Sequence, residues 1–264
     1  FGVFDVMIEG PKVKWLISEA FLSDYRIVVP KSDYREYLKD DGSDTKDYTR
    51  EAMAYASLNS HIVGDVVKNY IKWANGKQTI VFADSVAAGE RMEKEFRDNG
   101  INAKLLTGET PSLERRRAVA DFAENTIKVL INIDLFDEGF DISAKKGRRI
   151  IECVIMARPT KSLGKFLQVF GRGLRPAYAD GFDLSTREGR IAAQKASYKP
   201  YAIIIDHVGN IGVGKKEMHG LPDKVRVWTL DNIVKRKDSV NLIAICYNTN
   251  CSSPYDKALT ACPY

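Results

Sequence analysis

The sequence predicts an α/β fold in which a parallel β-sheet is covered by helices on both faces. Short segments that are almost wholly apolar alternate along the chain with segments of helical periodicity. Strands without a polar side belong to sheets that are buried on both faces, and such sheets are typically parallel. The composition, 44% hydrophobic and 28% charged over 264 residues, is sufficient for a core of this kind.

The elements are expected in the following order. A small unit comes first, with a strand over 4–8, a helix over 13–21 and a strand over 26–30. The polar segment over 31–50 is expected to be a loop or linker whose charges need no partner. The regular part then follows, with helices over 57–73, 85–99 and 110–124 and strands over 78–83, 103–106, 127–133, 150–156 and 201–206.

Capping residues support these helices. Ser85 is expected to start one helix and Gly100 to end it, while Thr110-Pro111 places proline at a first helical position. Because ligands of open α/β sheets bind beyond the carboxyl ends of the strands, we expect the functional residues at that edge.

A further helix is expected from Ser162 onwards, with one apolar and one polar side. The apolar side, expected to face the core, consists of Leu163, Phe166, Leu167, Phe170 and Leu174. Gln168, Arg172 and Arg175 follow at i, i+4 and i+7, which places them together on the other side. The planar forks of two arginines match phosphate or carboxylate oxygens, so this side is expected to bind an oxyanion.

The pattern Gln-x-x-Gly-Arg-x-x-Arg over 168–175 resembles motif VI of superfamily 2 helicases, a group that includes DEAD/DEAH-like, phage-type and DNA-repair-type members. The resemblance implies a RecA-like fold for the second helicase domain. It also implies that Gln168, Arg172 and Arg175 serve catalysis at an ATP whose phosphates and Mg²⁺ are held mainly by a first RecA-like domain. Arginines in such positions raise phosphoryl-transfer rates by roughly 10³ to 10⁵.

Three other segments resemble helicase motifs in the expected order. Residues 80–85 look like motif IV, residues 106–109 like the next block, and residues 129–142 like motif V. The resemblance implies that Gly139 allows close backbone approach to the nucleotide, and that Asp141 meets the ribose or fixes motif VI.

The same blocks supply candidate contacts to a nucleic-acid backbone. Many family members have Thr before the motif V aspartate, whereas this chain has Asn132 followed by Ile133, so Asn132 can donate from its amide instead. Ser85, Thr107 and the backbone amide of Gly108 are the other candidates, because hydroxyls and loop N–H groups bind phosphates without reading bases.

Residues 209–216 fit the spacing of a P-loop but not its chemistry. Lys216 stands where a P-loop needs Ser or Thr for Mg²⁺, and 217–222 contain Gly and Pro where a helix should begin. Neither another Walker A pattern nor an Asp-Glu-x-His box is found. The chain alone is therefore expected not to hydrolyse ATP.

The cysteines indicate a metal site in a small Cys-rich C-terminal tail. Cys246, Cys251 and Cys262 have the spacing C-x4-C-x10-C, which in a reducing cytoplasm favours Zn²⁺ over disulfides. The alternative is a metal-free terminus, because three thiolates make an incomplete structural site. Cys153 lies in an apolar strand and is expected to be a buried thiol.

We divide the chain into a crossover from a missing N-terminal RecA-like domain (1–30), a charged linker (31–56), the C-terminal RecA-like domain (57–222), and a basic extension with a truncated zinc-ribbon-like tail (223–264). The chain begins with Phe1, so it is expected to be part of a longer protein. The net charge is +5, and the sequence contains neither a membrane-length apolar run nor a signal peptide, so a cytoplasmic protein of a bacterial or phage-infected cell is expected.

The predicted function is that of the C-terminal half of an ATP-dependent helicase or translocase. Its expected partners are nucleic acid, with DNA as the expected polymer, and the N-terminal RecA-like domain in cis. One alternative is a non-enzymatic nucleic-acid-binding module built on a degenerate RecA-like domain. Another is a binder of small nucleotides that uses 209–215.

Overall fold

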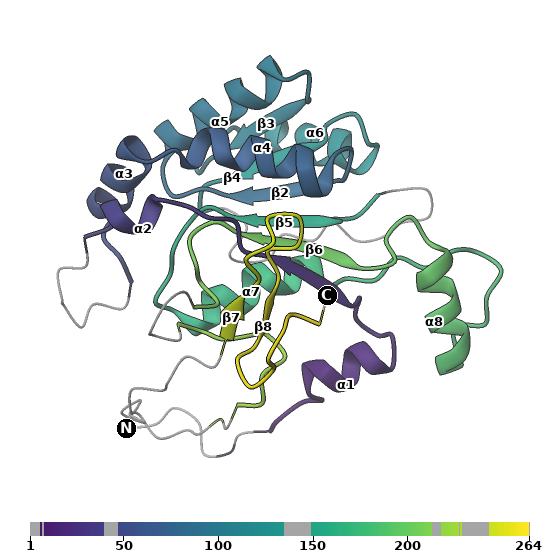
Figure 1. Ribbon diagram of the computed structural model, residues 1–264. Coiled ribbons are helices and arrows are strands. Elements are labelled where there is room, and N and C mark those ends of the chain that lie inside the picture. Colours follow the sequence, from purple (N-terminus) through teal and green to yellow (C-terminus); the bar gives the residue numbers. More distant parts are fainter. Residues whose placement is uncertain are drawn as a thin grey trace.

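The computed structural model describes residue 6 and residues 8–39, 47–134, 149–212, 218–226, 228 and 243–263. Its centre is a sheet of parallel strands in the order β1-β6-β5-β2-β4-β3 (Figure 1). The strands are β1 (Tyr25–Val28), β2 (Thr79–Phe82), β3 (Ala103–Leu106), β4 (Val129–Asn132), β5 (Cys153–Met156) and β6 (Ala202–Asp206). This is the RecA-like α/β architecture, so the predicted fold class is confirmed.

The register of the strands explains why the sequence shows no polar side. Val81 lies level with Ile131 on one neighbouring strand and Ile155 on the other, and these three residues belong to one core. The alternate residues Ile80 and Leu130 belong to a second core on the opposite face. Since the central strands β2, β4, β5 and β6 are buried on both faces, their positions are almost all apolar.

Helices cover both faces of the sheet. The first core is covered by α4 (Ile62–Ala74) and α5 (Val86–Asp98), where Tyr70 meets Phe96 edge to face with ring centroids 5.4 Å apart. The second core is covered by α6 (Ser112–Ala123) and α7 (Leu163–Gly173), which contribute Phe122, Phe166 and Phe170. In Figure 1, α4 and α5 lie above the sheet and α7 lies below it.

The remaining elements surround this centre. They are α1 (Val13–Ser18), α2 (Tyr34–Tyr37), α3 (Arg50–Asn59), α8 (Arg187–Ala196) and the antiparallel hairpin of β7 (Ile243–Ile245) with β8 (Pro254–Asp256). The hairpin is attached to the end of β1, because the Val29 amide donates to the Ser252 carbonyl at 2.8 Å. Among the described residues, none of the helices is long and apolar enough to span a membrane.

Several predicted boundaries are wrong. The helix expected over 57–73 is two helices, α3 and α4, which are separated at Ser60 and His61. The His61 amide donates to the Asp33 carboxylate at 3.1 Å instead of continuing the helical ladder. The strand expected over 150–156 begins only at Cys153. Most of the strand expected over 4–8 lies outside the described residues.

The N-terminal strand has a different place from the one expected. The strand predicted over 26–30 was assigned to a small separate unit, whereas β1 pairs in parallel with β6 and forms an edge of the main sheet. The proposed division into domains is not decided by this pairing and stays a prediction.

Two glycines of α7 test how closely this helix packs on the sheet. A Cβ atom on Gly173 would lie 3.0 Å from the Ile204 side chain and 3.1 Å from the Val154 side chain, whereas a Cβ atom on Gly171 would meet nothing within 4 Å. We expect Gly173→Val to lower the free energy of unfolding by about 1–3 kcal/mol through overpacking. Gly171→Val, the matched control, should change it by less than about 0.5 kcal/mol in urea titrations. Equal effects of the two substitutions would contradict this packing.

Candidate functional site at the carboxyl edge of the sheet

The carboxyl ends of neighbouring strands bring polar side chains together at one edge of the sheet. A small cavity of about 30 Å³ lies there, with Asn132, Asp134, Arg158, Thr160, Lys165 and Asn210 among its lining residues. Arg158, after β5, forms an ion pair with Asp134, after β4, and Arg50 of α3 approaches the same carboxylate at 3.6 Å. This is the edge at which ligands of parallel α/β sheets bind.

A buried carboxylate connects this edge to the helices that precede β2. Asp84, which follows β2, accepts hydrogen bonds from the Tyr34 hydroxyl at 2.6 Å and the Ser57 hydroxyl at 2.5 Å. Burial raises the pKa of Asp84, and burial beside Asp84 raises the pKa of Tyr34. Asp84 therefore anchors α2 and α3 to the sheet.

The candidate nucleic-acid contacts lie at the ends of three adjacent strands. Ser85 follows β2 and caps α5, where its hydroxyl accepts from the Ala88 amide at 3.3 Å. Thr107 follows β3, and its hydroxyl accepts from the Glu109 amide at 3.2 Å. Gly108 is exposed beside it, whereas Asn132, the last residue of β4, is 1% exposed and lines the cavity. The strand order thus places all of these candidates on one edge.

The arginine-bearing helix α7 starts as predicted. The Ser162 side chain accepts from the Lys165 amide at 3.3 Å, which makes Ser162 the N-cap. Phe166, Phe170 and Leu174 are buried in the second core, and Leu163 and Leu167 pack against that core. The predicted apolar side is therefore confirmed.

The end of this helix differs from the prediction. The helix ends at Gly173, so Arg175 lies beyond it and does not share a helical face with Gln168 and Arg172. The reason is Pro176, whose ring disfavours the helical conformation of the residue before it. Gln168 is exposed, and both arginines are half-buried and have partners.

A buried lysine fixes the backbone from which Arg175 projects. Lys199 is 1% exposed, and its ammonium donates to the Gly173 carbonyl at 2.6 Å and to the Arg175 carbonyl at 2.5 Å. Ser23 binds the same turn through its amide, which donates to the Leu174 carbonyl at 2.7 Å, and through its hydroxyl, which donates to the Arg175 carbonyl at 3.2 Å. Successive carbonyls at the helix end are thus held by two distant segments.

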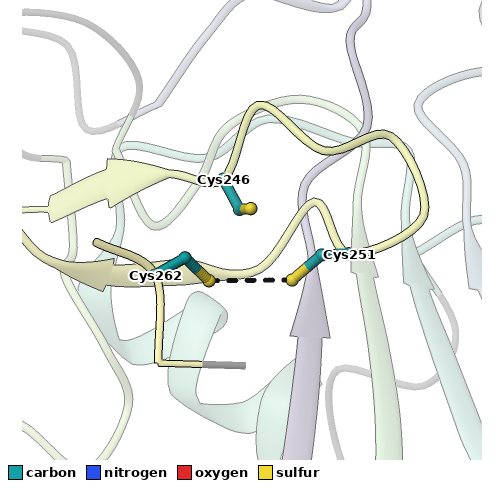
Figure 2. A group of neighbouring side chains, drawn as sticks. All are labelled: Cys246, Cys251 and Cys262. Atoms are coloured by element: carbon teal, nitrogen blue, oxygen red, sulfur yellow. Dashed lines mark hydrogen bonds between the residues drawn. The ribbon is translucent and has the colours of Figure 1, made fainter.

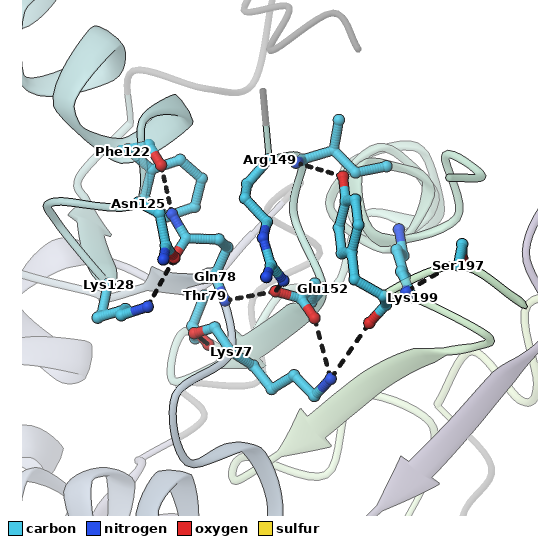
Figure 3. A network of polar contacts seen from close by, with 12 residues as sticks. Lys77, Gln78, Thr79, Phe122, Asn125, Lys128, Arg149, Glu152, Ser197 and Lys199 are labelled. Carbon is cyan, nitrogen blue, oxygen red and sulfur yellow. Dashed lines mark hydrogen bonds and ion pairs between the residues drawn. The ribbon is translucent and has the colours of Figure 1, made fainter. Parts of the chain in front are cut away.

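Sequence reasoning missed Lys199, because a lysine between Tyr198 and Pro200 carries no local sign of burial. It also missed Glu152, which is 2% exposed and accepts from Lys77 at 3.0 Å, from the Gln78 amide at 3.2 Å and from Arg149 at 3.4 Å (Figure 3). This network lies at the amino edge of the sheet, away from the candidate site, and joins β2 to β5.

Some predicted residues lie outside the described part of the chain. Gly139 and Asp141 of the motif V block are among them, as are Gly214 and Lys215 of the P-loop-like segment. Their roles stay predictions.

The predicted cysteine cluster forms in the C-terminal hairpin. Cys246 follows β7, Cys251 lies in the connection to β8, and Cys262 follows β8. Their sulfur atoms lie within 4.8 Å of one another, and those of Cys251 and Cys262 are 3.8 Å apart (Figure 2). Hydrogen bonds from Ser253 lower the pKa of Cys251. Three thiols at this spacing can bind a soft divalent metal such as Zn²⁺.

The predicted buried thiol is also confirmed, because Cys153 is 0% exposed and burial raises its pKa. It lies in β5, whereas the clustered cysteines are half-buried in the hairpin and accessible to a metal ion.

The pH dependence of stability tests the burial of Lys199. Burial lowers the pKa of Lys199 to about 7, whereas an unfolded lysine has a pKa of about 10.4. Between these values the unfolded state binds more protons, so this residue makes the free energy of unfolding rise with pH, and below about pH 7 its contribution is constant. We expect the free energy of unfolding of the wild-type chain, minus that of Lys199→Met, to increase by up to about 1.4 kcal/mol per pH unit between about pH 7 and pH 10. Urea titrations that give a constant difference would contradict it.

The chain matches a helicase domain family and is similar to proteins of a phage and a yeast. The helicase conserved C-terminal domain family matches residues 63–177. A 51.5 kDa protein of Lactococcus phage isolate 7-9 is 33% identical over 98% of the chain and 50% of the phage protein. IRC3 of Saccharomyces cerevisiae, whose name describes it as an ATP-dependent helicase, is 31% identical over 61% of the chain and 22% of that protein.

Among solved structures, the E. coli DEAD-box protein SrmB matches with a TM-score of 0.43 and 17% identity, over 70% of the chain and 77% of SrmB. The chain spans about half the length of its phage relative and less of the yeast one. The motifs, the fold and the family match agree with one another. The chain therefore contains a superfamily 2 helicase C-terminal domain.

Proposed function

We propose that the chain is the C-terminal half of an ATP-dependent nucleic-acid helicase or translocase. The observation that supports it most strongly is the turn at the end of α7, where Lys199 and Ser23 hold the backbone of Arg175 through hydrogen bonds to carbonyls. A guanidinium that meets a transferring phosphoryl group must be held in place before the reaction, because its stabilising effect depends on preorganisation. A rigid turn within a helicase domain meets this requirement.

In this proposal ATP and Mg²⁺ are bound mainly by an N-terminal RecA-like domain in cis. Arg172 and Arg175 reach the phosphates across the cleft between the domains, and Gln168 orients them or couples ATP to nucleic acid. Gly139 and Asp141 contact the nucleotide or fix the arginine helix, as the resemblance to motif V implies. Opening and closing of the cleft with the ATP state would then move the strand.

The nucleic acid is proposed to lie over the carboxyl edge of the sheet. Ser85, Thr107, Gly108 and Asn132 are proposed to contact its phosphates, and we propose DNA as the polymer. Such contacts carry no base specificity and weaken with salt. The phage relative supports a cytoplasmic role in a phage-infected bacterial cell. The domain division given above, with 57–222 as the RecA-like domain, is part of the proposal.

Nucleic-acid-stimulated ATP hydrolysis tests the roles of the arginines. The protein to use is the longer polypeptide in which this chain follows an ATP-binding domain. We expect Arg175→Ala or Arg172→Ala to lower the stimulated rate by about 10³-fold or more, because the charge that develops on the transferring phosphoryl group loses a guanidinium partner. Nucleic-acid binding should be retained. Arg97→Ala, an exposed arginine on α5 that pairs with Glu93, is the matched control and should hydrolyse normally.

The same experiment separates the proposal from the non-enzymatic alternative. If the longer polypeptide shows no hydrolysis, or if both arginine variants hydrolyse at the wild-type rate, α7 is a binding surface and the motor proposal is wrong.

We also propose that Cys246, Cys251 and Cys262 bind Zn²⁺. The support is their convergence within 4.8 Å in the hairpin that is attached to β1. Since these ligands leave a fourth position open, the site would keep a water or an additional donor there.

Metal analysis tests this site. We expect the purified chain to contain about one equivalent of zinc, and Co²⁺ substitution to give the intense charge-transfer absorption of thiolate ligands. Cys251→Ser should abolish both signals, whereas Cys153→Ser, which changes a buried thiol of β5 outside the three-cysteine cluster, should preserve them. A zinc content that Cys251→Ser does not lower would show that the metal is bound elsewhere.

A further inference from the structure

An internal carboxylate lies in a basic site at the start of α7. We call this site the α7 cradle and define it as Thr160, Lys161 and Lys165. Asp47 accepts from the Lys161 amide at 2.9 Å, from the Thr160 hydroxyl at 3.1 Å and from the Lys165 ammonium at 3.1 Å. The expectation that the charges of 31–50 need no partner is therefore wrong for Asp47.

The cradle is rigid, and its chemistry is suited to a phosphate group. The Thr160 amide donates to the Asn210 side chain at 3.0 Å, and the Thr160 carbonyl lies 2.8 Å from the His219 ring. A hydroxyl, a backbone amide and an ammonium converge there, and the same groups hold phosphate oxygens in nucleic-acid interfaces. Although burial alone raises the pKa of Asp47, hydrogen bonds from Lys161 and Lys165 lower it below its usual value. The cradle thus stabilises an anion.

A pocket lined with tyrosines adjoins the cradle. It has a volume of about 360 Å³, and its lining includes Tyr37, Tyr48, Tyr55, Lys39 and Lys161. The Lys161 ammonium lies 4.9 Å from the centre of the Tyr48 ring, and the Lys39 ammonium lies 5.5 Å from the centre of the Tyr55 ring. Lys161 belongs to both features, since its amide faces Asp47 and its side chain lines the pocket.

Aromatic rings beside lysines are the features that bind single strands without base specificity. Successive bases stack on the rings while the cations follow the backbone, and stacking tolerates any base because every base has an aromatic face. The volume is at the lower end of small-molecule pockets, which suits a single base. The tyrosine pocket therefore matches the base, and the adjacent α7 cradle matches the phosphate, of one nucleotide in a strand.

We propose that the α7 cradle and the tyrosine pocket together bind one nucleotide of single-stranded nucleic acid, whose phosphate displaces the Asp47 carboxylate and whose base enters the pocket. This inference rests on the proposed function, because it extends the path of the strand from the sheet edge to α2 and α3. Asp47 holds the cradle in the free protein and competes with the strand.

Binding of a fluorescently labelled oligothymidylate to this chain, without ATP, tests the proposal. We expect Asp47→Asn to increase affinity several-fold, because the competing charge is removed. Asp98→Asn, the matched control, makes the same charge change on α5, where Asp98 pairs with Lys94, and should increase affinity less. In an Asp47→Asn chain, adding Lys165→Gln should remove the gain and reduce the log–log salt slope by about 0.7.

Tyrosine variants test the pocket separately. Tyr55→Leu should weaken binding by about tenfold, since it removes a ring on which a base stacks. Tyr247→Leu, which removes a ring that is 92% exposed in the hairpin, should leave affinity unchanged. Excess ATP with Mg²⁺ tests whether the site binds a free mononucleotide in place of the strand. We expect that it does not displace the strand. Circular dichroism verifies that each variant is folded.

Equal effects of Asp47→Asn and Asp98→Asn, wild-type binding by Tyr55→Leu, or displacement of the strand by ATP would each overturn the proposal. These outcomes are separate from those of the arginine test. If the longer polypeptide hydrolyses ATP through Arg175 while the cradle and pocket variants bind normally, only this inference fails. If hydrolysis is absent while these variants behave as expected, the strand site is correct and the motor proposal fails.

Discussion

Burial of the parallel sheet on both faces is the constraint on which the rest of the structure depends. With apolar residues such as Ile80 and Val81 filling opposite cores, polar groups can collect only at the ends of the strands. Glu152 and its partners occupy the amino edge, where they join strands. The ion pair of Arg158 with Asp134 and the cavity beside it occupy the carboxyl edge. The fold thereby separates an edge whose polar groups join strands from the edge that carries the candidate functional site.

The helix α7 connects the candidate site at the carboxyl edge to the arginines. Its start carries the α7 cradle, where Asp47 is bound, and its end carries the turn held by Lys199. The body of the helix is fixed by Phe166 and Phe170 in the core and by close contact of Gly173 with the sheet. A nucleic-acid strand at the cradle and ATP at the arginines would thus contact opposite ends of α7. A rigid helix between them is a physical route by which the two binding events can be coupled.

The sequence was sufficient for features that depend on local patterns. Periodicity predicted the parallel sheet, the start of α7 near Ser162 and its buried side, and capping chemistry predicted the start of α5 at Ser85, all of which the structure confirms. Features made by contacts between distant segments were missed. Lys199 and Asp47 contact α7 only in the folded chain, so no local sequence pattern marks them. The exclusion of Arg175 from the helix, in contrast, follows from Pro176 and could have been predicted from the sequence.

The proposed function requires Arg172 and Arg175 to meet the phosphates of an ATP held by a second domain. The most direct measurement is the distance between a fluorophore on α5 and one on that domain, in the longer polypeptide with single-stranded DNA and a non-hydrolysable ATP analogue. We expect the analogue to bring the fluorophores closer together, and the double variant Arg172→Ala with Arg175→Ala to prevent this approach while the analogue still binds. Equal approach in the wild-type and variant proteins would contradict the claim.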